Sequence, residues 1–200
     1  LLYAGREGIS RGELIDRLYG REDLEDAGAT LRVNIYRLRK YIQKLKCFEN
    51  DDCIWFQEGV YRWNYTAVPL ERDTDHFNTT AEAALKEENP EIKMDLLKEA
   101  CRMYRGEFLP ELAGEEWVAI ESCKYQKLYV DCINEAAVLL KENGQFAELL
   151  ELSSQASSIY YFEEYYLMQI DCLMALGRYK EAMEIYETAA AFYFEELGLE

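Results

Sequence analysis

The sequence has few of the residues that mark metal centres. It contains one histidine and six cysteines in 200 residues, and no two cysteines form a C-x-x-C pair. His76 is 23 residues from the nearest cysteine, so a zinc site is not indicated. Cys101, Cys132 and Cys172 lie in helical apolar patterns, where a reduced thiol packs as a small apolar group. We therefore predict no metal, no cofactor and a reducing, cytoplasmic location.

Sequence signatures of catalysis and of membrane insertion are also missing. Residues 5–8 resemble the start of a phosphate-binding loop but lack its Lys-Ser/Thr pair, and no G-x-S-x-G motif is present. The sequence has no run of about 18 apolar residues, the length that predicts a membrane span. We expect a protein that is not an enzyme, has no catalytic residues and does not enter a membrane.

Acidic residues dominate the chain, but not its beginning. The net charge is −17, with 39 acidic and 22 basic residues. Residues 1–46 hold 10 basic and 7 acidic residues, whereas residues 47–200 hold 12 basic and 32 acidic residues. Residues 30–46 have no acidic residue and six basic ones: Arg32, Arg37, Arg39, Lys40, Lys44 and Lys46. This asymmetry is typical of a nucleic-acid-binding segment joined to an acidic effector.

Two helices are predicted in this first part. Ser10 and Glu13 form a capping box, which indicates a helix that ends at Gly20 and turns Leu14, Ile15 and Leu18 inward. A longer helix is expected from about residue 25 to residue 46. Its apolar residues repeat at spacings of four and three and should be buried on one face: Leu31, Ile35, Leu38, Ile42 and Leu45.

The opposite face of the long helix carries the basic residues. Helical periodicity places Arg37, Lys40 and Lys44 there, beside Val33 and Tyr36. Two further basic residues, Arg32 and Arg39, flank this face. A basic face can simply keep a helix soluble, but soluble surfaces usually mix both signs of charge. The absence of acidic residues over 17 positions of an acidic chain favours a DNA-binding face.

Residues 53–66 predict a β-hairpin. They are rich in aromatic and β-branched residues, and Gln57-Glu58-Gly59 lies at their middle. Helix, turn, long basic helix and hairpin follow one another in the order found in a winged helix-turn-helix. We therefore expect residues 1–68 to form a winged-helix DNA-binding domain that is incomplete at its N-terminus, with the hairpin as its wing.

The rest of the chain, residues 69–200, is expected to be a tetratricopeptide-like α-helical array without strands. Helices are predicted at about residues 91–105, 115–142, 145–158, 162–176 and 179–196. The segment at residues 144–148 recurs at residues 177–181, an offset of 33, close to the tetratricopeptide period. Gly144 and Gly177 should lie in turns, and Phe146 and Tyr179 should occupy equivalent packed positions. The overall fold class is thus mainly α.

Several short motifs resemble a known family. Residues 32–40 resemble the recognition helix of response-regulator-type winged helices, and residues 59–63 resemble the end of their wing. Four later segments resemble motifs of the bacterial transcriptional activator domain: residues 73–77, 97–109, 176–182 and 195–200. Together these motifs cover most of the chain in the order of the antibiotic-regulatory-protein type of bacterial activator.

The resemblance implies binding to double-stranded promoter DNA as a homodimer and recruitment of RNA polymerase. It also places Arg62 in the wing, and we count this residue among the DNA-binding ones. One departure concerns the wing tip, where related wings have an arginine that enters the minor groove and this chain has Gln57-Glu58. Glu58 should repel phosphates, which puts reading of the minor groove by this wing in doubt.

Two hypotheses of different kinds follow. In the first, the protein is a DNA-binding transcriptional activator: Arg37, Lys40 and Lys44 enter or flank the major groove, and Arg32 and Arg39 contact phosphates. The acidic array then serves dimerisation or contact with polymerase. In the alternative, the protein is an interaction scaffold whose degenerate winged helix binds DNA weakly or not at all. A mobility-shift assay with promoter DNA separates the two.

Overall fold

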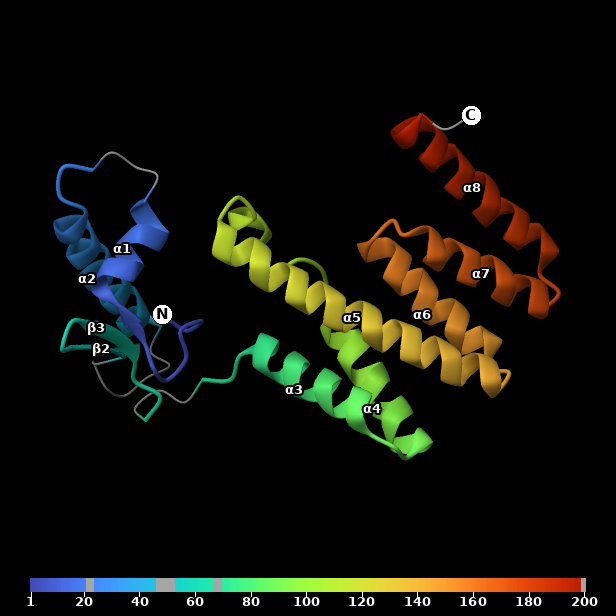
Figure 1. The fold of residues 1–200 in the computed structure, drawn as a ribbon, viewed down its shortest axis with the longest axis horizontal. Coiled ribbons are helices and arrows are strands. Elements are labelled where there is room, and N and C mark those ends of the chain that lie inside the picture. The colour runs from blue at the N-terminus through green and yellow to red at the C-terminus, as the bar shows by residue number, and fades with distance from the viewer. Residues whose placement is uncertain (21–23, 46–52, 67–69, 199–200) are drawn as a thin grey trace. The chain divides into compact units, whose positions relative to one another are not determined.

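The computed structural model describes residues 1–20, 24–45, 53–66 and 70–198, and the side chains of residues 196 and 197 are not described. The chain divides into two compact units, residues 1–71 and residues 72–200 (Figure 1). All described strands lie in the first unit, and the second unit is helical. The mainly α fold is thus confirmed. The boundary predicted at residues 68 and 69 involves residues outside the described ranges and stays a prediction.

In the residues that the structure describes, the first unit contains two helices and a small antiparallel sheet. Helix α1 (Arg11–Tyr19) and helix α2 (Ala27–Lys44) follow strand β1 (Ile9–Ser10) and precede strands β2 (Ile54–Gln57) and β3 (Val60–Trp63). The strand order in the sheet is β1-β3-β2. The predicted cap of α1 is confirmed, because the Ser10 hydroxyl oxygen accepts a hydrogen bond of 3.1 Å from the backbone N–H of Glu13. Strand β1 was not predicted, since two residues carry no periodicity.

The predicted hairpin is confirmed as β2 and β3. Its two turn residues, Glu58 and Gly59, both have positive φ, at 53° and 80°. Two positive φ values in succession are the backbone geometry of a type I′ turn, whose twist matches that of the two strands. The carbonyl oxygen of Gly59 accepts a 2.8 Å hydrogen bond from the N–H of Arg11. This bond ties the turn to the start of α1.

The core of the first unit is small, and part of its prediction is wrong. Its buried apolar residues come from both helices and all three strands: Ile9, Leu14, Leu31, Ile35, Cys53, Ile54, Tyr61 and Trp63. Leu38 on α2 is 42% exposed, Leu45 directly after α2 is 55% exposed, and Leu18 on α1 is 53% exposed. The predicted burial of these three leucines is therefore wrong, because spacing along one helix does not supply the element that must pack against it.

The described part of the second unit is a row of six α-helices: α3 (Asp73–Lys86), α4 (Pro90–Met103), α5 (Glu116–Glu142), α6 (Phe146–Ile159), α7 (Glu163–Ala175) and α8 (Tyr179–Leu197). Successive helices pack against each other (Figure 1), and a short 3-10 helix, Pro110–Leu112, precedes α5. The five helices predicted beyond residue 90 are confirmed, whereas α3 had been noticed only as a motif at its start. Among the described residues, no helix is long and apolar enough to cross a membrane.

The repeat at an offset of 33 residues is visible in the backbone. Gly144 and Gly177 have φ values of 68° and 72° and lie in the turns before α6 and α8, as predicted. The N–H that follows each glycine bonds to a carbonyl five residues earlier, Gln145 to Leu140 at 2.9 Å and Arg178 to Leu173 at 2.8 Å. These are Schellman caps, in which glycine adopts the left-handed conformation without strain.

The side chains after the two glycines differ, which corrects one prediction. Phe146 is half-buried and packs against the cluster formed by Leu140, Leu149 and Cys172. Tyr179, its equivalent, is exposed at 64%. Helix α7 lies over the first position, and no described helix follows α8 to cover the second. The equivalence therefore holds for the backbone but not for the packing.

The large core of the second unit is lined by tyrosines and free thiols. The rings of Tyr104 and Tyr129 are stacked with their centroids 4.3 Å apart, and the hydroxyl oxygens of Tyr104 and Tyr160 are 2.6 Å apart. Cys101 and Cys132 are buried and free, and burial raises the pKa of each thiol to about 12, so both stay protonated at neutral pH. This agrees with their predicted role as small apolar side chains.

The remaining candidates for metal chemistry do not gather into a site. His76 is exposed and lies on α3, with its Nε2 3.6 Å from Glu99 Oε1. Within the described part of the chain, no three His, Cys, Asp or Glu side chains form a group that could hold a metal ion. Cys47 lies outside the described residues.

Candidate nucleic-acid interface

Helix α2 is anchored at its start and along one face. The Asp26 carboxylate accepts a 2.8 Å hydrogen bond from the N–H of Ala29, which caps the helix. Leu31 and Ile35 are 1% and 7% exposed and hold the first half of α2 in the core. The Asn34 side-chain amide donates a 2.7 Å hydrogen bond to the Tyr19 hydroxyl, so α2 is also linked to α1. These contacts fix which face of α2 is turned outward.

That outward face is basic and lacks compensating charge. Arg32, Arg37, Lys40 and Lys44 are all exposed, and α2 itself contains no acidic residue. None of these four side chains forms an ion pair with another described residue. The ion pairs between described residues lie elsewhere, most of them on the acid-rich helices of the second unit. Lys46 lies outside the described residues. An uncompensated row of cations on one helix face attracts a polyanion.

Aromatic side chains are interleaved with these cations. Tyr36 and Tyr41 are exposed at 61% and 68%, and the Lys40 Nζ lies 5.9 Å from the centre of the Tyr36 ring. A cation held over an aromatic face loses part of its side-chain freedom before it meets a ligand. The sequence did not single out Tyr41, because its only distinguishing feature is its exposure, which the structure shows.

Arg39 has a different environment from the one expected. It is partly buried, and its guanidinium donates a hydrogen bond to the carbonyl oxygen of Ile54 at the start of β2. Successive side chains of a helix are rotated by about 100° around its axis. Arg39 therefore points away from Arg37 and Lys40 and toward the wing. Its position suits a residue that holds the hairpin against α2 rather than one that reaches a phosphate.

The wing presents a mixed surface. Arg62 is half-buried on β3, and its Nε donates a 3.1 Å hydrogen bond to the carbonyl of Glu7. Trp55 and Phe56 are exposed at 45% and 49%, although alternation along a strand should bury one of the two. Glu58 is exposed at the tip. The turn of the predicted wing, Gln57-Glu58-Gly59, therefore presents no cation.

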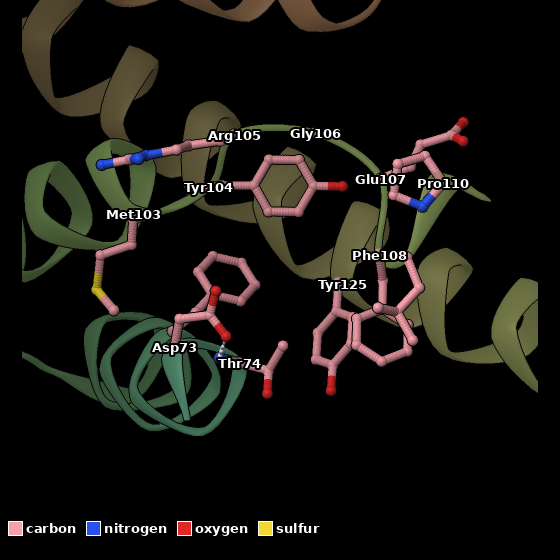
Figure 2. Close-up of a pocket in the computed structure, with 12 residues that line it drawn as sticks. Asp73, Thr74, Met103, Tyr104, Arg105, Gly106, Glu107, Phe108, Pro110 and Tyr125 are labelled. Atoms are coloured by element: carbon pink, nitrogen blue, oxygen red, sulfur yellow. Dashed lines mark hydrogen bonds between the residues drawn. The ribbon is translucent and has the colours of Figure 1, made fainter. Parts of the chain in front are cut away.

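The motif at residues 104–109 has a structural role in the second unit. It forms the corner between α4 and α5, where Gly106 and Leu109 have φ values of 140° and 46°. The N–H of Phe108 donates a 3.3 Å hydrogen bond to the hydroxyl of Ser122. Figure 2 shows the rings of Tyr104 and Phe108 at a pocket of about 620 Å³, with Arg105 extending away from them.

Comparisons with known proteins agree with this division. The family model of the bacterial transcriptional activator domain matches residues 72–200, the whole of the second unit. Among solved structures, the chain is similar to Mycobacterium tuberculosis EmbR in complex with a low affinity phosphopeptide, with a TM-score of 0.59 and 16% identity. The match covers 96% of this chain and 51% of that one, so the chain spans about half the length of that relative. At this identity the likeness concerns the fold alone. A comparison with curated proteins gives no match.

Proposed function

The chain belongs to the bacterial transcriptional activator domain family, and we propose that it is a transcriptional activator of the antibiotic-regulatory-protein type that binds promoter DNA through α2. The observation that carries this proposal is the row of four exposed cations without ion-pair partners among the described residues. The major groove of DNA is about 12 Å wide and admits one α-helix. The anchored position of α2 on the first unit suits such docking.

Each basic residue has its own proposed role. Arg37 lies near the middle of α2 and is the candidate for a contact to a base edge, since arginine can bond guanine with two hydrogen bonds. Arg32, Lys40 and Lys44 contact phosphates and supply affinity that is independent of sequence. Arg39 and Arg62, which bond to backbone carbonyls, hold the wing and the N-terminal segment in place.

The acidic array supplies protein contacts. Residues 47–200 have 20 more acidic than basic residues, so this part of the chain repels DNA. We assign to it the dimerisation and the contact with RNA polymerase that the family resemblance implies. A dimer doubles the number of phosphate contacts and thereby offsets the repulsion.

A second candidate function rests on the wing tip. Glu58 is exposed where related wings have an arginine, and a carboxylate there opposes phosphate binding. In this alternative, the chain is an interaction scaffold whose winged helix has lost most of its affinity for DNA. Both candidates use the acidic array for protein contacts and differ only in the role of α2.

A charge-reversal experiment tests the DNA-binding proposal. The variant Arg37→Glu/Lys40→Glu/Lys44→Glu alters the proposed face, and Lys86→Glu/Lys127→Glu/Lys180→Glu alters three exposed lysines of the second unit by the same net charge. We expect wild type and the control to enrich the same motif from a random duplex library, and the first variant to bind no duplex in a mobility-shift assay at low salt. Equal binding by all three proteins would show that α2 is not the reader. Absence of binding by the wild type would favour the scaffold.

A further inference from the structure

The outer face of the α7–α8 hairpin carries an apolar groove. It has a volume of about 450 Å³ and is lined by two residues of α7 and four of α8: Ile170, Met174, Tyr179, Ala182, Met183 and Tyr186. Met183 and Tyr186 are exposed at 57% and 59%. Apolar side chains concentrated in one groove at the end of a helical row are a surface that a partner covers.

The preceding hairpin indicates which kind of element covers such a surface. Thirty-three residues before the exposed Met183 and Tyr186 stand Leu150, which is partly buried, and Ser153, which is 0% exposed. Helix α7 covers these positions: Leu150 packs against a cluster that contains Cys172, and the Gln169 amide donates a 3.3 Å hydrogen bond to the Ser153 carbonyl. In the inner copy of the repeat, the face that is open on α8 is therefore occupied by an α-helix.

The exposed apolar side chains of α8 also have the spacing that is needed to pack a second helix against them. Besides the face that it packs against α7, α8 has a second apolar stripe with spacings of four, three, four and four: Tyr179, Met183, Tyr186, Ala190 and Phe194. Phe194 is exposed at 57%. A stripe with this period accepts the ridge of a second helix along most of its length.

The charge around the groove selects the partner. Residues 163–195 contain seven acidic and two basic residues. The two basic side chains are already paired, Arg178 with Glu181 and Lys180 with Glu184. Helical periodicity places Glu163 on the same face of α7 as Ile170 and Met174, and Glu187 directly beside Met183 on α8. Glu163 and Glu187 have no ion-pair partner among the described residues.

We propose that this groove binds an amphipathic α-helix of a partner protein, with an apolar stripe flanked by lysine and arginine. A second copy of the same surface is a poor occupant, because it would bring two sets of acidic residues together. The inference deepens the role of protein contact that we assign to the array and rests on that role. It does not depend on DNA binding by α2.

Fluorescence anisotropy with a synthetic peptide tests this proposal. The probe is a labelled helix of about 18 residues, five turns, with leucines at positions i, i+3, i+4 and i+7 and flanking lysines. Two control peptides have the same composition in scrambled order or glutamates in place of the lysines. We expect wild type to bind the lysine helix at least about tenfold more tightly than either control peptide.

Three protein variants locate the binding site. Met183→Ser/Tyr186→Ser should weaken binding by about tenfold or more, whereas Val138→Ser, which alters a 55% exposed residue of α5, should leave it unchanged. Glu163→Gln/Glu187→Gln should weaken binding several-fold and flatten its salt dependence. Circular dichroism of each variant should match the wild type, since all five residues are exposed.

Other outcomes would overturn the proposal. Equal binding of the scrambled peptide would indicate unspecific attraction to an acidic protein. Concentration-dependent dimers of the wild type that are lost in Met183→Ser/Tyr186→Ser would identify a second copy as the occupant. The DNA-binding variant Arg37→Glu/Lys40→Glu/Lys44→Glu should bind the lysine helix normally, so failure of the DNA proposal is distinguishable from failure of this one.

Discussion

Helices α2 and α8 have 18 and 19 residues, and each leaves two tyrosines more than half exposed. On α2, Tyr36 and Tyr41 stand among five basic residues and no acidic one. On α8, Tyr179 and Tyr186 stand among five acidic residues and one lysine. Both helices bury one face and offer another, so the charge around similar aromatic groups determines which partner each attracts. We therefore propose a polyanion as the partner of α2 and a basic helix as the partner of α8.

The two helices also differ in how firmly they are supported. Among the described residues, the first unit has eight buried apolar residues in one cluster, of which α2 supplies two, Leu31 and Ile35. The described part of the second unit has a cluster of 15 buried residues and a further cluster of five. A small core leaves little reserve of stability, so a single core substitution has a larger consequence in the first unit.

Truncation of a core side chain should have a larger effect in the first unit than in the second. Leu31→Ala removes a side chain that is 1% exposed and should cost about 2–5 kcal/mol, enough to unfold the first unit and abolish DNA binding. Leu173→Ala, at 3% exposure on α7, should lower the thermal stability of the second unit and weaken binding of the lysine helix. Differential scanning calorimetry with both binding assays checks the pair. Loss of both activities in either variant would mean that the units do not act separately.

Single substitutions on α2 should separate a base contact from phosphate contacts. Arg37→Ala should cost about 1–3 kcal/mol of DNA-binding free energy and relax the preference at one base pair, because it removes a base contact. Lys44→Ala should weaken binding to all sequences alike and reduce the salt slope by about one. Titrations at several salt concentrations against single-mismatch duplexes measure both effects. If Arg37→Ala kept the full sequence preference, the base contact would have to come from another residue.

Local signals in the sequence predicted those parts of the fold that local chemistry determines. A serine three residues before a glutamate is enough to form a cap at Ser10, and glycine at Gly144 and Gly177 is enough to end a helix in the left-handed conformation. The family resemblance was confirmed by the match over residues 72–200. For the site, periodicity correctly turned Arg32, Arg37, Lys40 and Lys44 outward.

The errors in predicted burial and in the role of Arg39 concern what lies opposite a helix face. Leu38 and Tyr179 have the correct spacing for burial and are exposed, because burial also needs a covering element from elsewhere in the chain. Arg39 looked like its basic neighbours, yet the start of β2 is close enough to accept its hydrogen bond. Such tertiary contacts leave no trace in the spacing of residues along one helix.

The two glycine turns allow a matched test of the repeat. Gly144→Ala and Gly177→Ala each place a side chain at a φ near 70°, and no heavy atom lies within 4 Å of the added carbon at either site. Each should therefore cost about 1–2 kcal/mol through backbone strain alone. Thermal melts should give the same shift for both. A larger cost at Gly144 would mean that the covered and open hairpins differ in their turns as well as in their surfaces.

Removal of the negative charge at the wing tip should have the smallest effect on stability and DNA affinity. Glu58 combines a positive φ of 53° with an exposed carboxylate, and Asn-Gly is the preferred dipeptide for this turn. Glu58→Asn should stabilise the first unit by roughly 0.5–1 kcal/mol through reduced strain. It should also raise DNA affinity a few-fold at low salt, because a carboxylate no longer faces phosphates, and this gain should fade as salt increases. Glu151→Gln, which removes an exposed carboxylate of the second unit, controls for net charge. A gain in stability without any gain in affinity would place the wing tip away from DNA and leave α2 as the sole contact of the first unit.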